Sequence, residues 1–291
     1  MATDPAPSPP TRLRVPSSLE QVQKLARYQL REYLRSRRFV ALALIVAAIG
    51  VLVTAILAHF RTELVTDDLA FYGSLWGGGA NVVIILAAVF FGGDAIAGEF
   101  QNKTGYFLMG LPVRRATVYV GKFVAAFIAA LAMLLLFLGI LLGNGIYYFH
   151  ADAFPWQLGV SFVLAVVLLA AVLGTTFLFS SLFKTSAYGF VMAAILYLIG
   201  FTILEELIVG LVKIEPWMVI SYASSTVGNV FAPNVNWGIR ATVVTTTIPG
   251  PNPVTATSYA PGIAEGVVIM LGYLLVTAAA GLGLFEREEF A

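Results

Sequence analysis

Apolar residues along this chain gather into six long, nearly uncharged stretches, and the segments between them hold most of the charges. Each stretch has at least 20 residues, the length with which an α-helix crosses the hydrocarbon core of a bilayer. The pattern therefore predicts an all-α polytopic membrane protein with a six-span transmembrane domain over residues 39–285. The predicted spans are Phe39–Ala58, Leu69–Gly93, Phe123–Phe149, Ala153–Phe183, Thr185–Leu204 and Gly266–Phe285.

Residues 17–38, ahead of the first span, have the pattern of an amphipathic helix. Ser17, followed three residues later by Glu20, forms a capping box. We expect an interfacial helix lying on anionic lipid in the headgroup layer, and a simple positively charged anchor is the alternative. Residues 1–16 contain five prolines and are expected to form a disordered tail. The basic side chains expected to hold this helix are Arg31, Arg35, Arg37 and Arg38.

The segment between spans five and six, residues 205–262, is expected to lie outside the cell. Its section from Lys213 to Pro261 is rich in Pro, Asn and Thr and has few charges. We expect a small cap on the outer surface, with short or re-entrant helices near Leu207–Val212 and Met218–Val230. A disordered tether is the alternative, and it is the expected structure locally at residues 245–253.

Composition narrows the function further. Only 11% of the residues are charged and 59% are hydrophobic, whereas a soluble protein has about 25% charged residues. A net charge of +1 provides no basic field for nucleic acid. The absence of cysteine and the presence of only two histidines argue against thiolate or multi-histidine metal sites.

The distribution of Lys and Arg predicts the orientation, because positive residues are retained on the cytoplasmic side. Fourteen of the 17 lie before span one, between spans two and three, between spans four and five, or after span six. The other three are Arg61, Lys213 and Arg240. Both termini, including a short tail at 286–291, are therefore expected in the cytoplasm.

Enzyme motifs fit this sequence poorly. Gly93 and Gly98 have the spacing of a phosphate-binding loop, but Glu99 stands where that loop needs lysine. The acidic pair Glu205-Glu206 lies at the end of a span, where charge is costly. Some intramembrane proteases place an arginine four residues after such a pair, where this chain has Gly210. The two glutamates are interpreted as the outer end of span five, or together with Asp94 as pathway or gating residues.

The segment between spans two and three carries the most information. Span two leaves the bilayer at Asp94, where capping of the helix or pairing with Lys122 is expected, and a turn follows at Gly110 and Pro112. Between them lies an apolar cluster that would be a liability on a cytoplasmic loop unless another protein covered it. We therefore expect a helix over about 98–110 that enters a partner's groove. The apolar cluster is Tyr106, Phe107, Leu108 and Met109.

At these residues the sequence resembles the permease subunits of ABC type-2 transporters. Their motif is matched in order and spacing, although Gln101 and Lys103 stand where an acid and a glycine are common. The charged end of the chain is also similar to the family's short tail. The matching residues are Ile96-Ala97-Gly98-Glu99, Thr104, Leu111-Pro112-Val113, Arg115 and Gly121-Lys122.

The resemblance implies a non-catalytic subunit in the plasma membrane, most simply an exporter. Its expected partners are a separate ABC ATPase subunit that carries ATP and Mg²⁺, a second permease copy or a paralogue, and membrane lipid, with no nucleic acid. The alternatives are a permease-like subunit that transmits motion to an extracytoplasmic partner without moving a solute, and an intramembrane enzyme. The residues implied in coupling to the ATPase are Glu99, Phe100, Gln101, Thr104, Tyr106, Phe107, Leu108 and Met109.

Overall fold

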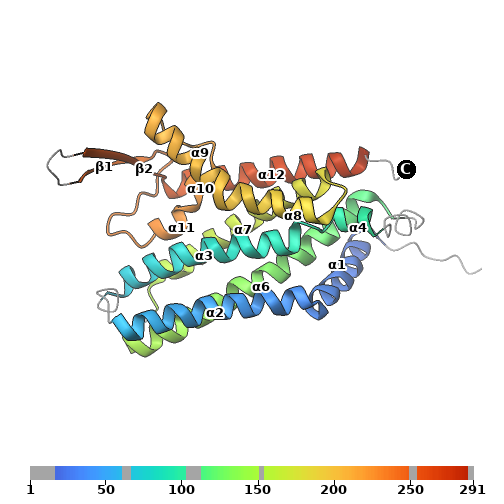
Figure 1. Ribbon diagram of the computed structural model, residues 1–291, viewed down its shortest axis with the longest axis horizontal. Helices are drawn as coiled ribbons and strands as arrows, with labels where there is room; N and C mark the ends of the chain where they lie inside the picture. Colours follow the sequence, from blue (N-terminus) through green and yellow to red (C-terminus); the bar gives the residue numbers. More distant parts are fainter. Residues whose placement is uncertain (1–16, 61–66, 103–112, 151–153, 249–253, 288–291) are drawn as a thin grey trace, which may run out of the picture.

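The computed structural model describes residues 17–60, 67–102, 113–150, 154–248 and 254–287. Within these ranges, six helical segments are long and apolar enough to cross a membrane, which confirms the predicted number of spans. They run lengthwise beside one another as an elongated bundle (Figure 1). The six are α2 (Arg37–Phe60), α3 (Asp68–Gly92), α6 (Arg115–Phe149), α7 (Trp156–Leu182), the segment α8–η3–α9–η4 (Ser186–Val212) and α12 (Ile263–Arg287).

The core of the bundle lies around α3 and α7. Phe71, Tyr72 and Trp76 of α3 are fully buried, and the Trp76 indole donates to Ser161 Oγ of α7 at 2.9 Å. In contrast, only a small share of the residues in α2, span five and α12 is buried. A surface of this kind suits lipid or another apolar protein surface.

The predicted interfacial helix is α1 (Ser18–Arg35), and its capping box is confirmed. Glu20 N donates to Ser17 Oγ and Ser17 N donates to Glu20 Oε2, both at 3.3 Å. The helix ends at Ser36, so Arg37 and Arg38 belong to the first turn of α2 and not to α1. Part of its apolar face packs on α6, where Gly121 lies close to Leu25.

Span five is longer than its apolar stretch predicts. The helix continues through α8 (Ser186–Ile195), η3 (Leu196–Gly200), α9 (Phe201–Leu207) and η4 (Ile208–Val212), of which η3 and η4 are π-helical. The separate helix expected near Leu207–Val212 is therefore wrong, because these residues form the last turns of span five. Lys213, with a left-handed backbone (φ 55°), ends the helix.

The segment after span five contains two short helices and a β-hairpin. Helices α10 (Ile220–Ser224) and α11 (Thr226–Asn229) lie where short helices were expected. The expected tether at 245–253 is wrong over residues 245–248, because strand β1 (Thr242–Ile248) pairs antiparallel with β2 (Val254–Ala260), with Thr245 opposite Thr257. The hairpin projects beyond the helices (Figure 1).

The two ends of the bundle differ in what they carry. One end holds α1, the short helix α4 (Ala97–Gln101) and the last turn of α12, and we call it the basic end (Figure 1). The other end holds the β-hairpin and α10, and we call it the hairpin end. The N-terminal helix and the end of α12 thus lie together, as an even number of crossings requires.

Candidate functional site

The candidate site is the segment Gly93–Asn102 at the basic end, which we call the α4 segment. Helix α3 ends with Gly93 as its C-cap, a turn follows, and α4 then adds five residues. Gly98 N donates to Asp94 O at 2.8 Å and Asn102 N donates to Gly98 O at 2.9 Å, so the segment is hydrogen-bonded throughout. Thr104 and the apolar cluster at 106–109 lie outside the described residues, so the expected helix is described only as far as Asn102.

A buried lysine ties the α4 segment to α6. Lys122 is 4% exposed, and its Nζ donates to Glu99 Oε1 at 2.5 Å and to Ala95 O at 2.9 Å. A buried ammonium group is tolerated only where such partners replace its lost hydration. The expected pairing of Asp94 with Lys122 is therefore wrong: Glu99, five residues farther along the chain, takes that place.

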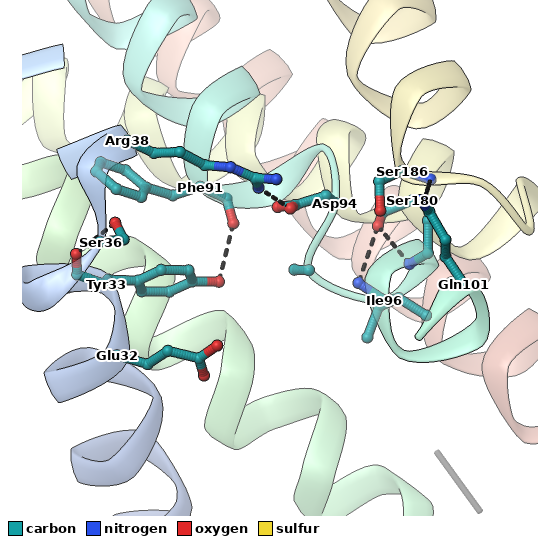
Figure 2. Close-up of polar contacts among 12 residues, drawn as sticks. Glu32, Tyr33, Ser36, Arg38, Phe91, Asp94, Ile96, Gln101, Ser180 and Ser186 are labelled. Atoms are coloured by element: carbon teal, nitrogen blue, oxygen red, sulfur yellow. Dashed lines mark hydrogen bonds and ion pairs between the residues drawn. The ribbon is translucent and has the colours of Figure 1, made fainter. Parts of the chain in front are cut away.

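Asp94 instead pairs with Arg38 in the first turn of α2 (Figure 2). The Arg38 side chain is 61% exposed, whereas that of Asp94 is 19% exposed. Water screens a pair of this kind more strongly than the buried Lys122–Glu99 pair. The Arg38–Asp94 pair therefore contributes little to stability, and it aligns the start of α2 with the end of α3.

The end of α1 is joined to α3 as well. The Tyr33 hydroxyl donates to Phe91 O at 3.1 Å, and the two rings lie 5.3 Å apart (Figure 2). Burial raises the pKa of Tyr33 well above its usual range, and the Asp94 carboxylate raises it further. Ser36 accepts from Phe39 N at 3.1 Å and donates to Tyr33 O at 2.7 Å, so its hydroxyl bridges the break between α1 and α2.

On its other side the α4 segment meets α7 and α8. Ser180 Oγ of α7 accepts from Ile96 N at 2.9 Å and from Ala97 N at 3.0 Å (Figure 2). Gln101 Oε1 accepts from Ser186 N, the first residue of α8, at 2.9 Å. Gln101, which was expected to face an ATPase, therefore faces α8. The hydrogen bonds that Ser180 accepts could not be predicted from the sequence, because the position of Ser180 within the apolar span does not distinguish it from other residues there.

A groove of about 910 Å³ opens between α1, the α4 segment and the start of α6. Both ion pairs, Arg38–Asp94 and Lys122–Glu99, contribute to its lining. Asn102 and Val113, the described residues on either side of the 103–112 segment, line it too. The groove thus lies where the chain leaves and re-enters the bundle at the basic end.

The remaining predicted site residues lie elsewhere. Arg31 and Arg35 are exposed on α1. At the hairpin end, Glu205 Oε2 accepts from Ser221 Oγ of α10 at 2.5 Å, whereas Glu206 is exposed. The structure therefore does not bring Asp94 and the two glutamates into one site, because they lie at opposite ends of the bundle (Figure 1).

A second polar contact at the hairpin end involves the loop before α10. The Tyr222 hydroxyl donates to Glu215 Oε1 at 2.7 Å. Burial, and then this hydrogen bond, raise the pKa of Tyr222 above its usual range. Within the described ranges, no three His, Asp or Glu side chains come together as metal ligands.

The polar contacts described at the two ends of the bundle thus join helices and loops to one another.

Comparison with known proteins assigns the family. A family model described as "ABC-2 family transporter protein" matches residues 23–290, which is nearly the whole chain. No curated protein matches the chain. The match includes most of α1, the α4 segment and all six spans. The chain therefore belongs to the ABC-2 transporter family and is the membrane permease subunit of an ABC transporter, a multi-pass protein of the plasma membrane.

Proposed function

We propose that this permease couples ATP hydrolysis on a separate ABC ATPase subunit to export of a substrate, with the α4 segment as the docking element. Family membership implies pairing with an ABC ATPase subunit. The observation that supports the docking element is the convergence of side chains from α2, α6 and α7 on one ten-residue segment. Because the α4 segment is bonded to α2, α6 and α7, a displacement of this segment by the ATPase would displace these helices with it.

The proposed orientation places the basic end in the cytoplasm. Of the 17 Lys and Arg residues, 14 lie in segments that the topology assigns to this side. ATP and Mg²⁺ would bind to the ATPase, beneath the α4 segment. Arg31, Arg35, Arg37 and Arg38 would face anionic lipid or the ATPase, since all four are exposed.

A second permease, either another copy or a paralogue, completes the proposed transporter. The exposed apolar side chains of α2 and span five are the surfaces available to it and to lipid. Two such subunits would enclose the pathway between them, and ATP binding would favour one access state. Glu205, at the hairpin end of span five, would then lie at the outer end of that pathway.

One observation favours the alternative role of passing motion to an extracytoplasmic partner. The β-hairpin projects from the hairpin end (Figure 1), and its base is fixed by a hydrogen bond from the Tyr259 hydroxyl to Lys213 O at 2.8 Å. Vesicle transport assays with candidate cargoes separate this role from export.

The docking element is tested by removing an aromatic ring from the segment that follows it. Phe107→Ala should abolish co-purification of the ATPase with the full-length chain and the stimulation of ATP hydrolysis by the permease. Phe154→Ala, an exposed phenylalanine just before α7, is the matched control and should retain both. If Phe107→Ala kept full co-purification and full stimulation, docking through the α4 segment and the apolar cluster at 106–109 that follows it would be ruled out.

A further inference from the structure

Two helices at the basic end are capped by side chains from other helices. The first amides of a helix have no acceptor within it, and neither Ile96 at the start of α4 nor Thr185 at the start of α8 supplies a side-chain cap. Ser180 of α7 accepts from the first amides of α4, and Gln101 of α4 accepts from the first amide of α8. Two turns are thus joined, the turn between α3 and α4 and the turn between α7 and α8. A residue at the α7–α8 turn caps the start of α4, and a residue of α4 caps the start of α8.

The same two turns touch through their backbones. A Cβ added to Gly189 of α8 would lie 2.4 Å from the Gly93 carbonyl oxygen. A Cβ added to Gly93 would lie 3.0 Å from the Phe190 Cα atom. No side chain separates the helices here, so the close packing adds to the hydrogen bonds that Ser180 and Gln101 accept.

Separating the turns would be unfavourable because of where Ser180 lies. Its side chain is fully buried, and movement of α7 away from α4 would leave two buried N–H groups without an acceptor. An unsatisfied donor in a dry environment costs more free energy than an average hydrogen bond contributes to stability. The α4 segment is thus held to α7 and α8 as well as to α6.

We propose that Ser180 and Gln101 are positioning residues that make the α4 segment and the α7–α8 turn one moving unit. Displacement of α4 by the ATPase is then carried into span five, in addition to α3 and α6, which adjoin α4 along the chain. This inference rests on the proposed function, because it needs an ATPase that acts on α4.

Span five is suited to receive this motion. Along its length most of its large apolar side chains are exposed, among them Ile195, Leu198 and Ile203. At the far end, Glu205 accepts from Ser221 of α10. A shift of α8 at the basic end therefore reaches the helices of the hairpin end through a single span.

The test compares variants of the full-length chain in complex with its co-purified ATPase, reconstituted in nanodiscs. Hydrogen exchange is measured without nucleotide and after trapping with ATP and vanadate, in peptides that cover 93–102 and 183–200. Ser180→Ala and Gln101→Ala remove the acceptors, and Ser180→Thr keeps the hydroxyl. Ser181→Ala is the matched control, since the neighbouring Ser181 is equally buried but donates only within α7, to Phe177 O.

In the wild type, in Ser180→Thr and in Ser181→Ala, trapping should change exchange in both peptides. In the ATPase-bound complexes of Ser180→Ala and Gln101→Ala, the change at 183–200 should fall by more than half while the change at 93–102 persists. Gln101 is exposed, so its variant serves even where Ser180→Ala fails to fold. A full response at 183–200 in Gln101→Ala, or in folded Ser180→Ala, would overturn the inference. No response at 93–102 in the wild type would instead refute the proposed function, and this inference with it.

Discussion

At the scale of single residues, the basic end contains two ion pairs that differ in burial. Lys122 and Glu99 have side chains that are 5% and 17% exposed, whereas Arg38 is 61% exposed. Loss of one partner from a buried pair leaves an uncompensated charge, whereas loss of an exposed partner leaves a solvated one. The two pairs should therefore respond very differently to substitution.

Replacement of Glu99 by leucine should lower the free energy of unfolding by about 3 kcal/mol, since it leaves the Lys122 ammonium buried without its carboxylate. The double variant Glu99→Leu/Lys122→Met should recover much of this loss, because it removes both charges. Arg38→Gln should cost about 1 kcal/mol or less. Thermal melting of the detergent-solubilised chain measures all three, and a double variant no more stable than Glu99→Leu would show that the buried charge is not the cause.

The Tyr33 hydroxyl provides a dependence on pH. Its pKa in the folded chain is raised, chiefly by burial, so the hydroxyl stabilises the fold below pH of about 10, the usual tyrosine pKa. That contribution is lost as pH rises further, because the unfolded chain then releases the proton first. Tyr33→Phe should be less stable than the wild type at pH 8 by about 1 kcal/mol, and the difference should shrink above pH 10.

Tyr28→Phe is the control for this titration. Tyr28 lies on the same helix and is 80% exposed. The Tyr28→Phe variant should therefore melt at the same temperature as the wild type at every pH tested. Melting midpoints taken from pH 8 to 11 give the comparison. A difference between Tyr33→Phe and the wild type that stays constant across this range would contradict the assignment.

At the scale of elements, span five shows how a helix keeps one face buried. Its contacts to the bundle recur every four residues, whereas an α-helix has 3.6 residues per turn, so such a stripe drifts around the helix. The wider π turn at Leu196–Gly200 takes up extra residues and reduces this drift. The stripe comprises Gly189, Ala193, Tyr197, Phe201 and Glu205.

The approach of α8 to α3 predicts a cost for any side chain at position 189. Gly189→Ala should destabilise the protein by about 1–3 kcal/mol, the range for overpacking, because the clash is with the Gly93 carbonyl oxygen. Gly272→Ala on α12 is the control, since a Cβ there meets nothing within 4 Å. Thermal melting separates the two variants, and equal midpoints would contradict the close contact.

The sequence predicts the elements of this molecule better than their partners. The length of the apolar stretches predicts the six spans, and the capping box of Ser17 and Glu20 predicts the start of α1, because both patterns are local in the sequence. The β-hairpin is not predicted although every residue of Thr242–Ile248 is β-branched, because the Pro-rich surroundings favour a tether. The pairing of Lys122 with Glu99 and the cap from Ser180 depend on which helices are neighbours, and no local pattern encodes that.

At the scale of the whole molecule, the two ends can be assigned to the two sides of the membrane by experiment. The chain has no cysteine, so a single cysteine at the exposed Asn102 or the exposed Thr245 reports one end alone. A membrane-impermeant maleimide should label Thr245→Cys on intact cells and Asn102→Cys only after permeabilisation. Labelling of Asn102→Cys from outside would reverse the topology and remove the proposed docking site from the cytoplasm.

The cap that Ser180 gives to α4 also has a consequence for biogenesis. The residues that meet at the α4 segment come from four separate parts of the chain, near positions 38, 95, 122 and 180. During synthesis Lys122 follows Glu99 within one pair of spans, but Ser180 emerges from the ribosome only near the end of α7. A nascent chain that ends before this point lacks the hydroxyl that caps the first amides of α4, so this turn reaches its final form only after α7 has been made.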